Sequence, residues 1–219
     1  MKLLLENWRK YLTEAAMTVD DLMNFKDEEF GEDLKIYIRV RPNAYDGGTN
    51  FTYASIDVDG EIYDFGYNDA VMGEVQIVPS NYSPKDGPCD GAYQVKWAIA
   101  TEGWGPLLYD VAIEYATKYG NGLISDREEV SDDARAIWDY YLGQRSDVDN
   151  YQLDDLTDTL TPEIDVDNCA QDIIAPEWEH SGPLWRRELL KNSSLSKRYT
   201  KTPTTIIELE KLGRLMNET

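Results

Sequence analysis

The spacing of hydrophobic positions changes along the chain, from a helical period to an alternating one and back. Residues 2–14 carry leucine and aromatic side chains at helical spacing, which predicts a short amphipathic helix. A second helix is predicted over 19–29, because Thr18 can cap it and acidic residues follow in its first turn. From 34 to 100, short runs alternate apolar and polar residues, as strands with one buried face do.

The alternating part of the chain predicts an antiparallel meander. Asp59-Gly60 lies between two alternating runs and is a strong signal for a two-residue hairpin turn. The runs themselves cover 34–41, 51–58, 61–65, 72–78 and 93–100.

A strand, a glycine-containing turn and a long helix follow one another between 93 and 119. Pro106 suits the first turn of this helix and Gly120 suits its end. A short strand over 122–125 and a helix over 131–142 come next. The peptide N–H groups at the start of a helix are unpaired and lie at the positive end of its dipole, so this turn is a generic anion site.

This order carries a resemblance to a known family. The residues concerned are Gly103-Trp104-Gly105-Pro106-Leu107-Leu108, Ala112 and Ala116, Gly122-Leu123-Ile124, and Ser131, Ala134, Trp138, Tyr140 and Tyr141 before Gly143. Together they resemble the central motif of the GNAT acyltransferases, over about residues 34–143. The resemblance implies an α+β fold with a mostly antiparallel mixed sheet flanked by helices, here followed by an irregular acidic C-terminal extension.

The resemblance also implies a site and an activity. In that family the amides of a Gly-x-Gly loop hold the pyrophosphate of acetyl-CoA, and a tyrosine on the next helix protonates the leaving thiolate. The implied function is acyl-CoA-dependent N-acyltransfer to an unknown acceptor. Carried over to this chain, Tyr140 or Tyr141 is the acid and Glu102 or Asp126 the base. The residues implied for acetyl-CoA binding are Ile99, Gly103, Trp104, Gly105, Leu107 and Leu108.

Three departures from the family pattern favour an alternative function. Thr101-Glu102 stands where the family has Arg or Gln, and Glu102 would repel a pyrophosphate. Only residues 42–50 are available where the family places two acceptor-binding helices. The tyrosine register is also ambiguous between Tyr140 and Tyr141. The alternative is a non-catalytic GNAT-like phage protein that serves as a virion or interaction protein.

The start of the chain resembles a targeting peptide. Residues 1–16 are similar to the N-terminal peptides that steer head proteins of large tailed phages into the prohead, where a protease cuts after Glu in Leu-x-Glu. Leu12-Thr13-Glu14-Ala15 fits that pattern. The resemblance implies a phage protein whose partners are head proteins or a host protein. The other reading is an ordinary helix that packs on the domain. The expected organisation is a peptide over 1–14, a GNAT-like domain over 15–143, and an acidic loop region with a basic helical tail over 144–219.

Charge narrows the range of partners. The net charge of -21 disfavours general binding to nucleic acid, because phosphates are repelled. Residues 183–219 are the exception, with eight Lys or Arg against four Glu. We expect this tail to dock on the acidic body, so a nucleic-acid contact is expected only through the tail.

Cysteine, histidine and acidic residues give no sign of a metal site. Cys89 and Cys169 form no CxxC pair, which predicts neither a disulfide framework nor zinc and favours a reducing compartment. His180 is the only histidine, so a His-based metal site or a Ser–His triad is not expected. The Asp-rich stretch 144–182 lacks the spacing of a calcium loop and reads as a solvated acidic loop.

No apolar run is long enough to span a membrane, and charge interrupts the first residues too early for a secretory signal. The expected location is the host cytoplasm, with the virion as a second place if the protein is packaged.

Overall fold

The computed structural model describes residues 16–25, 35–65, 72–174 and 183–218. They fall into two compact units. The first comprises the described parts of Met1–Gln76 with Trp97–Ala112 and Pro203–Thr219, and the second comprises Ile77–Lys96 and Ile113–Thr202. The helix expected over 2–14 and the expected cut after Glu14 lie outside the described residues.

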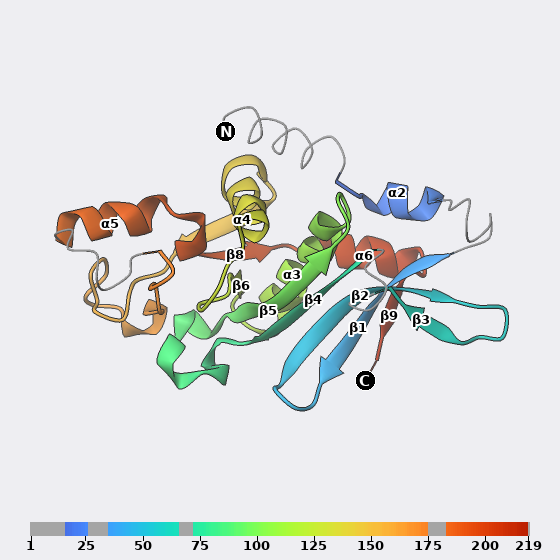
Figure 1. The fold of residues 1–219 in the computed structure, drawn as a ribbon, viewed down its shortest axis with the longest axis horizontal. Coiled ribbons are helices and arrows are strands. Elements are labelled where there is room, and N and C mark those ends of the chain that lie inside the picture. The colour runs from blue at the N-terminus through green and yellow to red at the C-terminus, as the bar shows by residue number, and fades with distance from the viewer. Residues whose placement is uncertain (1–15, 26–34, 66–71, 175–182, 219) are drawn as a thin grey trace. The chain divides into compact units, whose positions relative to one another are not determined.

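The first unit is built around an antiparallel hairpin and its neighbours (Figure 1). Strand β1 (Ile36–Asn43) pairs with β2 (Gly48–Ile56), and β2 pairs in turn with β3 (Ile62–Asp64), both antiparallel. The predicted hairpin around Asp59-Gly60 is present, but its loop is longer than the two-residue turn expected, because the N–H of Asp57 donates to the carbonyl of Glu61 and the N–H of Gly60 to the carbonyl of Asp57. The Asp57 carboxylate accepts the N–H groups of Asp59 and Glu61, and Gly60 has a φ of 85° that glycine adopts without strain.

The C-terminal residues complete the first unit. Helix α6 (Thr204–Lys211) leads to β9 (Leu215–Asn217), which is parallel to β1. The basic tail was expected to be helical, but Gly213, at a φ of 63°, follows the end of α6 and the chain turns into a strand. Near the other end of the chain, α2 (Val19–Asn24) begins at Thr18, which forms the expected cap with Asp21.

Two strands run from one unit into the other. β4 (Gly73–Pro79) lies next to β2 in the sheet, and β5 (Tyr93–Ala100) lies next to β4. Gly73 has a φ of 148°, and a Cβ there would lie 2.8 Å from the carbonyl oxygen of Ile99. The close approach of these two backbones therefore requires glycine at this position.

In the second unit the strand order is β7, β8, β6, β5 and β4. β6 (Leu123–Ile124) is parallel to the start of β5 and antiparallel to β8 (Lys197–Lys201), and β7 (Val148–Gln152) forms the edge, antiparallel to β8. The helices are the later part of α3 (Gly105–Tyr119), α4 (Asp132–Gln144) and α5 (Pro183–Asn192). Ser131 caps α4, as its sequence predicts.

Short 3-10 helices fill the connections of the second unit: η1 (Ser80–Tyr82), η2 (Pro84–Asp86), η3 (Cys89–Gly91), η4 (Asp165–Asp167) and η5 (Ser194–Ser196). Its core contains an aromatic cluster in which the rings of Trp138 and Tyr199 stack 5.0 Å apart.

The fold is α+β with a mixed sheet, as expected, since antiparallel pairs outnumber the parallel pairs β1–β9 and β5–β6 among those described. The expectation of an irregular C-terminal extension was wrong, because residues 148–217 contribute β7, α5, β8, α6 and β9. The sequence of β7 does not alternate between apolar and polar residues. β7 is an edge strand whose middle three residues are exposed, so it needs no apolar face. The boundary expected at residue 143 lies inside the second unit.

Candidate functional site

The candidate site is the turn that joins β5 to α3 in the first unit. It is a tight turn in which the N–H of Trp104 donates to the carbonyl of Thr101 at 3.0 Å. Gly103 has a φ of 83°, a conformation that L side chains rarely adopt, so this position requires glycine. Glu102 is exposed at the tip of the turn. Gly105 belongs to the first turn of α3 and has no positive φ. Of the two glycines, therefore, only Gly103 has a backbone conformation that requires glycine.

The side chain of Trp104 points into the first unit, where only 9% of the residue is exposed. Its ring makes edge-on contacts with the rings of Phe25 and Tyr53, at centroid distances of 5.0 and 4.9 Å. Such edge-to-face pairs add to the stabilisation that burial gives. Trp104 is therefore a packing residue of the first unit.

Two carbonyl groups of the turn are also anchored. The N–H of Met17 donates to the carbonyl of Gly103 at 2.8 Å, and the phenol of Tyr53 donates to the carbonyl of Trp104 at 2.8 Å. Burial, together with the negative charge of Asp110, raises the pKa of Tyr53 well above its usual value, so the phenol remains a donor at neutral pH. Sequence reasoning missed these anchors, because no motif marks Met17, Phe25 or Tyr53.

The residues expected to bind acetyl-CoA lie together in the first unit. Ile99 and Gly103 are half-buried, whereas Gly105, Leu107 and Leu108 are buried. The amides of the first turn of α3 have no acceptor within that helix, and Pro106 contributes no N–H. The accessible part of this region is consequently the tip of the turn, from Thr101 to Gly103.

The two candidate acids belong to α4 of the second unit. Tyr141 is fully buried and packs near Trp138 and Tyr199. Tyr140 is half-buried, with its ring edge-on to that of Tyr141 and the guanidinium of Arg145 5.8 Å from its centroid. Of the two, Tyr140 has the solvent access that a proton donor to a substrate needs.

Asp126, the alternative base, has a local structural contact. One of its carboxylate oxygens accepts the N–H groups of Glu128 and Glu129, at 2.7 and 3.3 Å. This arrangement shapes the turn before α4 and leaves Asp126 bound to its own loop.

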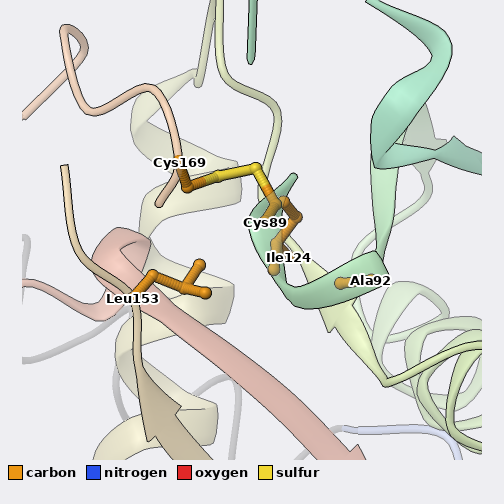
Figure 2. Close-up of a cluster of buried hydrophobic side chains, with 5 residues drawn as sticks. All are labelled: Cys89, Ala92, Ile124, Leu153 and Cys169. Atoms are coloured by element: carbon orange, nitrogen blue, oxygen red, sulfur yellow. A yellow bond between two sulfur atoms is a disulfide. The ribbon is translucent and has the colours of Figure 1, made fainter. Parts of the chain in front are cut away.

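The two cysteines are bonded to each other, although the sequence predicted no disulfide framework. Cys89 and Cys169 form a disulfide with their Cα atoms 4.6 Å apart, in a buried cluster with Ala92, Ile124 and Leu153 (Figure 2). The N–H of Cys89 also donates to the carbonyl of Asn168 at 2.9 Å. Because 80 residues separate the cysteines, no local spacing could signal the pair.

The acidic loop after β7 is ordered by buried carboxylates, contrary to the expected solvated loop. Asp154 and Asp155 are fully buried. Asp154 accepts the backbone N–H groups of Thr159, Leu160 and Thr161, at 3.1, 2.7 and 2.6 Å. Among the described residues, no group of three His, Cys, Asp or Glu could hold a metal ion. His180 lies outside the described residues.

Asp155 is ionised within this loop. Burial opposes its charge, but hydrogen bonds from Thr157, Arg186 and Thr159 outweigh burial and lower its pKa. Its partners are the hydroxyls of the two threonines and the Nε of Arg186, the latter at 2.6 Å.

The basic residues of 183–202 are largely engaged by acidic groups of the second unit. Arg186 pairs with Asp155, Arg198 with Asp90 and Lys201 with Glu114. Lys197 is buried and donates to the carbonyl of Lys191 at 2.6 Å, and burial lowers its pKa. These contacts hold the basic side chains on groups of their own unit.

No helix within the described ranges is long and apolar enough to cross a membrane. The chain matches no protein-family model, no curated protein and no solved structure.

Proposed function

We propose that the chain is an acyl-CoA-dependent N-acyltransferase with a GNAT-like fold. One observation carries the proposal. β5, a glycine turn, α3 and β6 follow one another, and β6 is parallel to β5. Their pairing covers only Tyr93 and Gln94 of β5, which continues to Ala100 beyond it. The resemblance implies this order, with the turn at the end of the longer strand facing an anionic ligand.

The proposed reaction assigns a role to each group. An amine of the acceptor attacks the thioester carbonyl, a C–N bond forms, and the C–S bond breaks. The resemblance assigns the proton that the amine loses to Glu102 or Asp126, and the proton that the thiolate takes to Tyr140 or Tyr141. The full burial of Tyr141 makes Tyr140 the better supported acid. Ile99 and the turn from Gly103 to Leu108 would hold the acyl-CoA.

Calorimetric titration with acetyl-CoA tests this function. Glu102→Gln removes a negative charge beside the pyrophosphate, so we expect about fivefold tighter binding, which corresponds to about 1 kcal/mol. The gain should shrink in high salt because the repulsion is screened. Glu129→Gln is the matched control, since Glu129 is an exposed glutamate of the second unit. Equal affinities of wild type and Glu102→Gln would contradict a pyrophosphate at this turn.

Glycine variants test the same turn independently. Gly103→Val forces a branched side chain into a positive φ and should abolish binding of acetyl-CoA. Gly105→Val adds bulk at the buried start of α3 and should also prevent binding. Circular dichroism must show that both variants keep the fold. Unchanged binding in folded variants would rule out this turn as the site.

A second function is favoured by a different observation. Trp104 and the first turn of α3 are buried, which supports a non-catalytic GNAT-like phage protein that acts in the virion or binds a partner. That function predicts no heat with acetyl-CoA at millimolar concentration, in wild type or in Glu102→Gln. It also predicts that protein from mature phage particles starts at Ala15 and that Glu14→Gln blocks the cut. An intact mass that includes Met1 would contradict packaging with processing.

A further inference from the structure

Residues 16–25 lie against the turn that the proposed function assigns to acyl-CoA. Two contacts join them: the 2.8 Å hydrogen bond from Met17 to the carbonyl of Gly103, and the edge-on packing of Phe25 on Trp104. They are at opposite ends of the segment, with α2 between them (Figure 1). The segment therefore contacts the turn twice, through backbone and through side chain.

The segment also contacts residues of the first unit outside the turn. Leu22 is 1% exposed, and the Nε of Arg214 lies 3.1 Å from the sulfur of Met23. The guanidinium of Arg214 is also 5.4 Å from the ring centroid of Tyr37 on β1. The segment is thus held between the turn and the C-terminal part of the first unit.

The two contacts restrain the turn in one conformation. In a trans peptide the carbonyl of one residue and the N–H of the next point in opposite directions. The hydrogen bond from Met17 to the carbonyl of Gly103 therefore fixes the direction of the Trp104 N–H. That N–H donates to the carbonyl of Thr101 inside the turn. An anion that needs the Trp104 N–H has to rotate this peptide, and rotation breaks the bond to Met17.

We propose that residues 16–25 are a strap that holds the turn from Thr101 to Gly105 closed and must be released for an anionic ligand to bind there. The ligand part of this proposal rests on the proposed acyl-CoA function. The mechanical part, which is that the strap restrains the turn, is independent of that function. Two separate measurements therefore distinguish them.

Hydrogen exchange measures the restraint. Met17→Pro removes the N–H that Gly103 accepts, whereas Met17→Ala keeps it and serves as the matched control. We expect exchange in a peptide covering 101–108 to rise about fivefold in Met17→Pro relative to Met17→Ala, as the loss of one typical hydrogen bond produces. A peptide from β2 should be unchanged. Phe25→Ala tests the ring contact without altering the backbone, and Asp20→Asn is its exposed control on α2.

Titration with acetyl-CoA measures whether release of the strap from the turn favours ligand binding. Met17→Pro and Phe25→Ala should each bind acetyl-CoA more tightly than their controls, by a factor similar to the rise in exchange. Equal exchange at 101–108 in the variants and their controls overturns the strap. Faster exchange with weaker binding also overturns it, because the segment then supports the site. Faster exchange with no binding in any variant leaves the restraint established and counts against the acyl-CoA function.

Discussion

Lys201 on β8 and Glu114 on α3 form an ion pair in which both side chains are buried. The backbone N–H of Lys201 also donates to the hydroxyl of Thr117, on the same helix as Glu114, at 3.1 Å. The pair thus joins the later part of α3 to the sheet inside the second unit. Removal of one partner would leave a charge in a place that water does not reach.

We expect Lys201→Met to lower the free energy of unfolding by about 3–5 kcal/mol, because Glu114 would stay buried without its cation. Urea denaturation followed by circular dichroism measures the loss. Lys211→Met is the control, since Lys211 is exposed on α6. Combining Lys201→Met with Glu114→Met should recover most of the stability. A double variant as unstable as the single one would show that the charge is not the cause.

Tyr53→Phe should destabilise the first unit. The variant keeps the ring packing on Trp104 but leaves the carbonyl of Trp104 without the phenol that donates to it. The loss of one typical intramolecular hydrogen bond costs about 0.5–1.5 kcal/mol. The change is measured by urea denaturation with Trp fluorescence as the signal. Tyr45→Phe is the matched control, because Tyr45 is fully exposed, and an equal effect of the two substitutions would refute the prediction.

Asp86→Asn should stabilise the protein at neutral pH. Burial raises the pKa of Asp86 above its usual value, so keeping its charge in the folded state costs free energy. A carboxyl whose folded pKa exceeds its unfolded pKa destabilises the fold above both values, and the cost disappears below the unfolded pKa, about 3.9. The gain should therefore be present at pH 7 and vanish near pH 3.

Unfolding by urea at the two pH values measures this difference. Asp172→Asn is the control, since Asp172 is exposed. A gain of the same size at pH 3 would mean that the amide stabilises for a reason unrelated to charge.

The disulfide should be present in protein purified without reductant. Alkylation after denaturation should then label no thiol, and both cysteines should be labelled once a reductant is added. Replacing Cys89 and Cys169 by Ser should lower the free energy of unfolding by about 4 kcal/mol, because a loop of this length loses its covalent closure. Two labelled thiols without reductant would show that the pair does not form in the isolated protein.

Local signals in the sequence were sufficient where structure is determined locally. Asp59-Gly60 predicted the hairpin because its turn requires a positive φ, and Ser131 predicted the start of α4 because a helix needs an acceptor there. The order of β5, α3 and β6 followed from the same kind of signal. Function and cofactor stay predictions, since they depend on a ligand that pattern alone does not reveal.

Features set by distant residues could not be predicted. The packing of Trp104 depends on Phe25 and Tyr53, which lie far away in sequence and carry no motif. The glycine with a positive φ in the turn is Gly103, and a Gly-x-Gly pattern does not say which glycine needs that freedom. The acidic loop looked solvated because composition does not show that Asp154 accepts several N–H groups from its own loop.

The bond between Cys89 and Cys169 makes the intervening chain a covalent ring. β5, α3, β6, α4 and β7 all begin and end within that ring. A protease that cuts once between the two cysteines opens the ring but releases no fragment. Such a nicked protein would run as a single chain on a denaturing gel without reductant and as two pieces with it. The electrophoretic pattern therefore reports nicking inside the ring separately from cuts in the segments outside it.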